Sequence, residues 1–452
     1  MITCDCTKRR TNKGKEIDSS RVATQHKARW VHIEGARKLG TGDWGQAGRQ
    51  SLSLSPVSCL LSFVCAGAAP SSDGSSSWPT ALTCFLSPAL CVIAAWTLIT
   101  SVVCAADWPF VRGNSNASAA LQDDLSENLD VVWKYSVDDS GFEATAVIAE
   151  DKVYLGDVDG TFYSIDMASG DLMWKRTFPE SGFLTGAAVF GGRVYVTDFN
   201  GVIFCLQASS GEPIWNFQAP SEAFAAPNVQ HGLVLVATDA GEVVTLSAQS
   251  GELKWRFRIE APLRCWPTVV DGRVLLAGCD ERLHAVDIAT AKEVDGVEID
   301  GPTGSTPARL GNDVFFGTEQ GTFYSIGSEP LEIRWMYHDS NSSLPIRVSA
   351  AVNRHAVVFS NDGKQVYALD PTTGKERWKF TVRSKVESSP VIAGKLVFVA
   401  TSRGRLHAID MATGEETWQF EAGGKFLASP ALSNGRLVIG NNDGTLYCFG
   451  EK

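Results

Sequence analysis

Four charged residues occupy one position in a repeating pattern along the chain, and a tryptophan stands two residues after that position in one copy. They are two glutamates, two arginines and a tryptophan: Glu143, Arg264, Trp266, Arg347 and Glu387. Carboxylates and guanidiniums can bind a ligand through charge-assisted hydrogen bonds, and an indole can pack against it. The same residues also have a purely structural interpretation, in which the charges pair with each other or face solvent and the indole fills the core. The choice between the two depends on the elements that position these side chains.

A tryptophan that recurs about every 40 residues identifies those elements. The series consists of Trp133, Trp174, Trp215, Trp255, Trp335, Trp378 and Trp418. The double step before Trp335 holds one degenerate copy near Val294. A fixed period in this range is typical of repeat architectures. Eight copies fit between residue 129 and the end of the sequence.

Each copy contains three short apolar runs ahead of its tryptophan segment. In the seventh copy they are 388–392, 395–400 and 404–409, with Gly394, Gly404 and Asp410 at their boundaries. Such runs indicate strands joined by tight turns. Four antiparallel strands per copy predict an all-β, eight-bladed β-propeller of four-stranded blades. The chain opens on a tryptophan strand and closes with only three runs, so we expect the N-terminal strand to complete the last blade.

The innermost strand of each propeller blade lines the central channel, and here these strands share a position occupied by Ala or Pro. Three residues earlier, the copies carry a ring of residues that we expect at one mouth of the channel: Glu143, Leu184, Phe224, Arg264, Gly304, Arg347, Glu387 and Leu427. Trp266 stands where the other copies have Thr, Gly, Ala or Ser. We therefore predict a ligand or partner site at this mouth, formed by Glu143, Arg264, Trp266, Arg347 and Glu387.

The repeat unit resembles a known family. At 368–378 and 408–418 it reads A-x-D-x-x-T-G-x-x-x-W, which resembles the tryptophan-docking motif of the pyrroloquinoline quinone (PQQ)-like β-propeller repeat. The opening D-W-P-F-V-R-G at 107–113 resembles that of exported bacterial proteins with this repeat. The resemblance covers 107–452 and implies that the seven tryptophans pack between neighbouring blades. The repeat is shared by quinoprotein dehydrogenases and by non-catalytic propellers such as the lipoprotein of the outer-membrane β-barrel assembly machinery.

A PQQ-dependent alcohol or sugar dehydrogenase is therefore the alternative function. In those enzymes PQQ stacks on a tryptophan, lies under a disulfide between adjacent cysteines and binds calcium. The chain has no adjacent cysteine pair, no long insertion between copies and no C-x-x-C-H haem motif. After residue 106 it also lacks C-x-x-C pairs and the G-x-S-x-G motif. We predict no catalytic residue, no metal site and no cofactor, with PQQ and calcium required only by the alternative.

The N-terminal quarter predicts export. Residues 81–106 carry no charge and end in small residues before Asp107, which is typical of a signal peptide. A retained membrane tether across 81–104 and lipidation at Cys104 are alternatives, although Val103 departs from the lipobox. Residues 1–80 are interpreted as a disordered or mis-assigned extension, and 107–128 as a linker ahead of the propeller at 129–452.

Charge narrows the choice of partners. Residues 1–106 carry a formal charge of +5 and the remainder −16. An acidic propeller argues against nucleic acid, because phosphate binding needs clustered Lys and Arg. We expect an exported, periplasmic or cell-envelope protein without catalytic activity that binds a protein partner in the envelope or a small ligand at the channel mouth. A membrane-tethered sensor domain is a third possibility.

Overall fold

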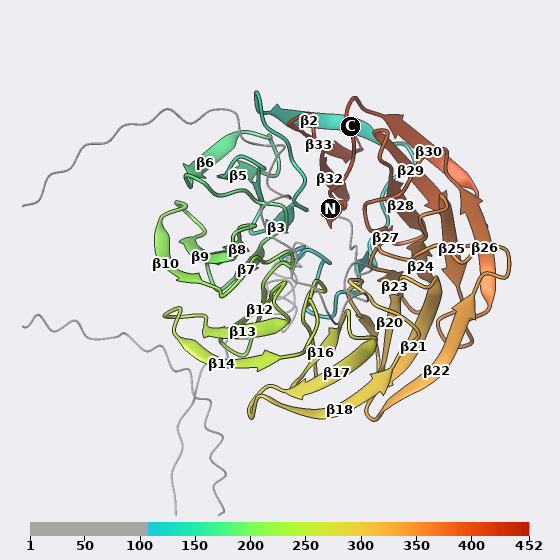
Figure 1. Ribbon diagram of the computed structural model, residues 1–452. Coiled ribbons are helices and arrows are strands. Elements are labelled where there is room, and N and C mark those ends of the chain that lie inside the picture. Colours follow the sequence, from blue (N-terminus) through green and yellow to red (C-terminus); the bar gives the residue numbers. More distant parts are fainter. Residues whose placement is uncertain (1–106, 452) are drawn as a thin grey trace, which may run out of the picture. The chain divides into compact units, whose positions relative to one another are not determined.

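The computed structural model describes residues 107–451. These residues form eight four-stranded antiparallel units arranged around a central channel, one of which carries an additional strand (Figure 1). The predicted eight-bladed β-propeller is confirmed. The predictions for 1–80 and 81–106, including the signal peptide and the tether, lie outside the described residues. Within 107–451, no helix is long and apolar enough to cross a membrane.

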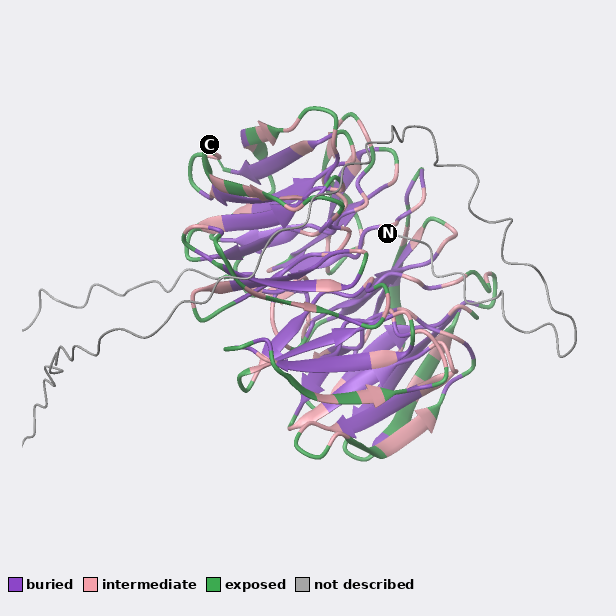
Figure 2. Cartoon of the chain, turned by 60° about the vertical axis from the view of Figure 1, so that its left-hand side comes forward, coloured by how far each residue is buried: buried purple, intermediate pink, exposed green. Residues whose placement is uncertain are grey.

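The first blade shows why this sequence forms strands of this kind. Its inner strands β3 (Val147–Ala149), β4 (Lys152–Gly156) and β5 (Thr161–Asp166) are almost entirely buried. Its outer strand β6 (Leu172–Thr177) alternates exposed and half-buried residues. Blades stack face to face, so the inner strands need apolar side chains on both faces. Figure 2 shows this distribution, with buried residues along the strands and exposed residues in the loops and outer strands.

The same order, from the channel outwards, repeats in the following six blades. Their strands are β7 (Ala188–Phe190), β8 (Arg193–Thr197), β9 (Val202–Gln207) and β10 (Pro213–Gln218); β11 (Asn228–Gln230), β12 (Leu233–Ala237), β13 (Glu242–Ser247) and β14 (Leu253–Arg258); β15 (Thr268–Val270), β16 (Arg273–Ala277), β17 (Arg282–Asp287) and β18 (Lys292–Glu298); β19 (Ala308–Leu310), β20 (Asp313–Gly317), β21 (Thr322–Ser328) and β22 (Leu331–His338); β23 (Ala351–Val352), β24 (Val357–Ser360), β25 (Gln365–Leu369) and β26 (Glu376–Thr381); and β27 (Val391–Ala393), β28 (Leu396–Ala400), β29 (Arg405–Asp410) and β30 (Glu416–Glu421).

The eighth blade joins the two ends of the propeller. Strands β31 (Ala431–Ser433), β32 (Arg436–Gly440) and β33 (Thr445–Gly450) come from the C-terminus, and β2 (Asp130–Ser136) supplies the outermost strand. β2 pairs antiparallel with β33, with Trp133 opposite Cys448. The expected closure by the N-terminal strand is confirmed, and it leaves no open seam in the ring.

The repeat tryptophans join one blade to the next. The indole Nε1 of Trp133 donates to the Met167 carbonyl at 3.0 Å, and that of Trp378 donates to the Met411 carbonyl at 2.8 Å. Five of the seven rings pack against a glycine of the next blade; a Cβ on Gly170 would lie 2.7 Å from the Trp133 ring. Gly170 also has a φ of +80°, which favours glycine. The glycine of the motif therefore provides room for the indole and also allows the left-handed backbone conformation.

The degenerate copy departs from this pattern in the fourth blade. Asp295 of β18 takes the tryptophan position opposite Ala285, and its carboxylate accepts the N–H of Leu331 at 2.8 Å. Ala291 takes the glycine position with a φ of +57°. The Trp255 indole Nε1, which should dock here, is buried without a partner in the described part of the chain. The Ala291 methyl group stands at the position where a glycine leaves room for the ring in five other blades.

An unpredicted feature precedes β2. Residues 107–121 run across the channel and bond to the inner strands of five blades. Trp108 and Phe110 pair with Ile148 and Ala188, and β1 (Ala120–Leu121) adds a parallel strand to β27. The carbonyls of Asn116 and Ser118 accept the N–H groups of Arg309 (2.8 Å) and Val352 (2.8 Å). We call residues 107–121 the channel segment. They belong to the range predicted to be a linker, yet they form hydrogen bonds with backbone groups on the inner strands of the blades.

We expect Ala291→Gly to stabilise the protein by about 1 kcal/mol, because it removes a left-handed alanine and frees space for Trp255. Thermal unfolding should show a higher midpoint. The matched control is Gly251→Ala in the third blade, whose new Cβ would lie 2.7 Å from the Trp215 ring and should lower the midpoint. A lower midpoint for Ala291→Gly would contradict this account of the docking site.

Candidate functional site

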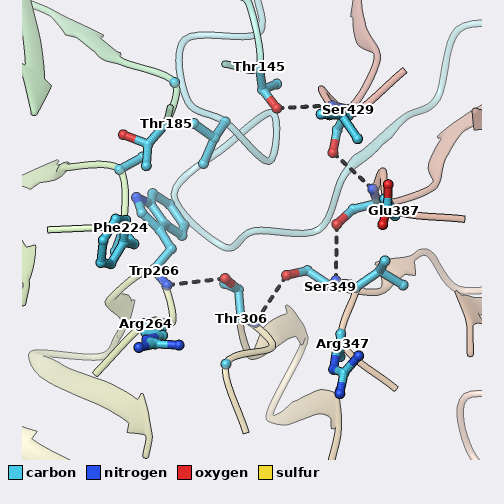
Figure 3. A pocket seen from close by; sticks show the side chains of 18 of the residues that line it. Thr145, Thr185, Phe224, Arg264, Trp266, Thr306, Arg347, Ser349, Glu387 and Ser429 are labelled. Carbon is cyan, nitrogen blue, oxygen red and sulfur yellow. Dashed lines mark hydrogen bonds between the residues drawn. The ribbon is translucent and has the colours of Figure 1, made fainter. Parts of the chain in front are cut away.

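One mouth of the channel holds a pocket, shown in Figure 3, with a cavity volume of about 180 Å³. All eight residues of the predicted ring line it. The structure therefore brings together the five proposed site residues: Glu143, Arg264, Trp266, Arg347 and Glu387. We call this pocket the funnel. Each ring residue lies between the outer strand of one blade and the inner strand of the next, as Arg264 does between β14 and β15. Eight equivalent connections thus surround one opening.

The channel segment forms part of the funnel lining. Val111 and Arg112 contribute to the wall, and Figure 3 shows the ribbon of this segment crossing the centre of the view. Gly186 makes room for it, since a Cβ there would lie 2.5 Å from the Val111 Cγ1 atom. The funnel is consequently a pocket with a floor at this level of the channel.

Two residues beyond the ring, hydroxyl groups tie successive blades together. The Oγ atom of each accepts a backbone N–H from the preceding blade. Ser349 N–H donates to Ser389 at 3.0 Å, Ser389 N–H to Ser429 at 3.0 Å, and Ser429 N–H to Thr145 at 3.1 Å. We call this the hydroxyl belt, which comprises Thr145, Thr306, Ser349, Ser389 and Ser429 (Figure 3). Its hydroxyl oxygens accept hydrogen bonds from backbone N–H groups that are buried between the blades.

Trp266 lies where the hydroxyl belt is interrupted. The second and third blades have Gly186 and Ala226 in the belt position. The indole Nε1 of Trp266 donates to the Pro227 carbonyl at 3.0 Å, and its ring packs against Phe110 with 5.9 Å between centroids. Trp266 is only 3% exposed. It therefore contributes packing to the funnel wall, as in the structural interpretation of this residue.

The rim charges are engaged with partners outside the predicted set. The Arg264 Nε atom lies 2.7 Å from an Asp239 carboxylate oxygen. Arg347 contacts Glu319 at 2.9 Å and also Asp362.

On the next blade, Lys385 bridges two carboxylates, lying 3.3 Å from Glu387 and 3.5 Å from Asp362. These pairs are partly exposed, and each stabilises the fold by about 1 kcal/mol or less. Glu143 lies half-buried on the funnel wall. The predicted charges share one pocket, and Arg264, Arg347 and Glu387 form ion pairs there with Asp239, Glu319, Asp362 and Lys385.

Three of these partners could have been found by the same alignment of the repeats. Asp239, Glu319 and Asp362 each stand two residues after the second strand of their blade. Arg112 carries no such signal, because it lies outside the repeat, although it is the arginine of the D-W-P-F-V-R-G motif.

Arg112 is the most deeply buried charge of the funnel lining, with 4% of its surface exposed. Its Nη2 donates to the carbonyls of Ala350 at 2.8 Å and Pro390 at 2.9 Å. Its Nε and Nη1 atoms are buried and have no hydrogen-bond partner among residues 107–451. Burial lowers the pKa of the Arg112 guanidinium to about 9, so it remains charged at neutral pH. Thr185, also on the wall, likewise has a buried hydroxyl without a partner in this part of the chain.

The comparison with protein families gives one match. The model described as outer membrane protein assembly factor BamB matches residues 158–335, 231–388 and 362–450. No curated protein sequence matches the chain.

Solved structures share the fold at low identity. The quinohemoprotein alcohol dehydrogenase from Comamonas testosteroni superposes with a TM-score of 0.64 at 16% identity, covering 77% of this chain and 81% of that one. A computationally designed protein, Ika8, gives 0.63 at 16%, covering 71% and 98%. A europium-containing methanol dehydrogenase gives 0.60 at 12%, covering 76% and 98%. At these identities the likeness shows the fold alone.

The hydroxyl belt can be tested by a pair of serine variants. Ser389→Ala removes the acceptor of the Ser349 N–H and should cost about 1 to 3 kcal/mol in the free energy of unfolding. Ser360→Ala is the matched control, because the Ser360 hydroxyl is buried without a partner among the described residues, and it should cost little. Denaturant unfolding measures both. Equal losses would show that the belt does not stabilise the contacts between blades.

Proposed function

The chain belongs to the outer membrane protein assembly factor BamB family, and from this premise we propose that it is an exported binding or scaffold protein without catalytic activity. Its family model spans 158–450 through overlapping matches. The binding face is the funnel mouth, and the partner is a protein of the cell envelope or a small ligand. The predicted export segment at 81–106 and the negative charge of residues 107–452 agree with this role.

The observation that supports the proposal is that the polar groups of the hydroxyl belt and the rim arginines already have partners within the protein. The serine and threonine hydroxyls of the hydroxyl belt accept hydrogen bonds from the backbone. The rim arginines Arg264 and Arg347 contact carboxylates. General acid–base or nucleophilic chemistry needs a titratable group directed at the reacting atom. These groups instead hold the blades and present a charged rim, which suits recognition.

The residues present do not fit a calcium–PQQ site. No group of three or more His, Cys, Asp or Glu residues within 107–451 could hold a metal ion. The indole of Trp266 packs against Phe110 and is almost fully buried, so it offers no open face for a quinone. A quinone cofactor would supply the oxidising chemistry of a dehydrogenase. The shared fold of the quinohemoprotein enzyme is what keeps this alternative worth testing.

The first experiment separates binding protein from enzyme. The full-length protein is titrated with PQQ and calcium, with absorbance and dye-linked oxidation of alcohols and sugars as readouts. We expect no saturable spectral change and no oxidation at high micromolar PQQ. Saturable binding with turnover would overturn the proposal in favour of the dehydrogenase alternative.

The second experiment locates the binding face. A photo-crosslinking amino acid is placed at Leu427, on the funnel, and in a separate variant at Met336 of β22, which is 60% exposed on an outer strand. We expect adducts with an envelope protein from position 427, or a co-purifying small molecule in native mass spectra. Adducts from position 336 alone would place the binding face elsewhere. The same material allows N-terminal peptide mass spectrometry, which tests whether 81–106 is cleaved or retained as the tether of a sensor domain.

A further inference from the structure

Within the binding role proposed above, we infer that the funnel recognises the carboxylate of a ligand with an apolar body, and that Arg112 receives the carboxylate. The inference depends on three features of the funnel: an uncompensated buried cation, the pairing of the other cations, and the distribution of apolar side chains on the wall. It assigns Arg112 as a binding residue that the repeat pattern does not identify.

The buried guanidinium provides the first step. Arg112 uses Nη2 to bond peptide carbonyls, while Nε and Nη1 have no partner among the described residues. A buried cation with unsatisfied N–H groups is costly unless an anion or an acceptor compensates it. Carbonyls satisfy part of the hydrogen-bonding capacity and leave the charge uncompensated. A ligand carboxylate would provide both the charge and the acceptors.

The other cations of the funnel lining provide the second step. Arg264, Arg347 and Lys385 each contact a carboxylate of the protein. Arg112 has no ion pair to a described residue, and burial alone shifts its pKa. One uncompensated positive charge matches one carboxylate. A phosphate dianion would require a second cation, which could be supplied only by breaking an existing pair.

The wall of the funnel provides the third step. Going round the ring, the charged positions Glu143, Arg264, Arg347 and Glu387 lie on blades one, four, six and seven. Apolar side chains lie on both sides of Glu143: Leu427 on blade eight, and Leu184 and Phe224 on blades two and three, all lining the funnel and partly exposed. An apolar group bound against these three side chains would remove their surface from water. The ligand class is therefore an apolar group with one terminal carboxylate.

Two sources can supply this chemistry, namely a free apolar carboxylic acid and the C-terminus of a peptide that ends in an apolar residue. Isothermal titration calorimetry of the full-length protein distinguishes them with two matched pairs. The first pair is hexanoate and hexanamide. The second is an N-acetylated tripeptide ending in leucine, with a free or an amidated C-terminus. We expect at least one acid to bind about tenfold or more tightly than its amide.

Variants test the assignment of Arg112. Arg112→Gln should abolish the preference for the acid, and Arg112→Lys should retain part of it. Arg112 also fixes the channel segment, so a second variant leaves that contact intact. Leu184→Asp places a negative charge on the funnel wall and should weaken the acid about tenfold while affecting the amide less. The matched control is Ile214→Asp on the outer strand β10, which is 40% exposed and should change neither affinity.

Equal affinity for acid and amide, or binding of neither, would overturn the inference. If neither acid binds while position 427 still forms adducts with an envelope protein, the carboxylate inference fails and the proposed binding role stands. If the acids bind by contact with Arg112 and neither adducts nor co-purifying molecules are found, the funnel site stands and the envelope partner fails. Retention of the acid preference in Arg112→Gln would assign the carboxylate to another cation.

Discussion

The inner strands of every blade are apolar on both faces, and the rest of the structure depends on this constraint. In the first blade, β4 and β5 bury nearly all of their residues, so each face needs a neighbouring blade. A row of such blades would expose an apolar face at each end, whereas a ring does not. Closure through β2 and β33 meets this need. The Trp418 indole adds a hydrogen bond of 3.0 Å to the Leu129 carbonyl, just before β2.

The regular register of the ring explains how much of the site could be predicted. Once the repeat is aligned, residues at equivalent positions must lie at one level of the channel, and Glu143, Arg264, Arg347 and Glu387 do so. The carboxylate partners of the two arginines also share one repeat position, two residues after the second strand of the blade, so the same regularity could have predicted them. The role of the channel segment was beyond prediction for a physical reason. The Arg112 bonds join residues more than two hundred positions apart, and no local pattern encodes them.

Polar residues in a propeller channel have two distinct uses here, and the structure separates them by their partners. The hydroxyl belt repeats a side-chain-to-backbone bond across blades, which fixes the spacing of the wall. Arg112 differs from the hydroxyl belt, because it bonds to the backbone with a charged group where a neutral hydroxyl would be sufficient. At Trp266 a large aromatic ring replaces the belt hydroxyl, next to blades in which Gly186 and Ala226 leave space at the same position. The funnel thus combines a wall held by repeated hydrogen bonds with one buried positive charge, on Arg112, that has no ion pair to a described residue.

The channel segment has a consequence for the order of assembly. It is the first of the described residues to be synthesised, yet Arg112 bonds to Ala350 and Pro390, which follow 238 and 278 positions later. Its docking therefore has to wait for the sixth and seventh blades, and the entropy of closing that long loop is lost late in folding. A nascent chain that stops before those blades has no floor in its funnel. Binding of the proposed ligand through Arg112 would consequently begin only after the sixth and seventh blades have been synthesised.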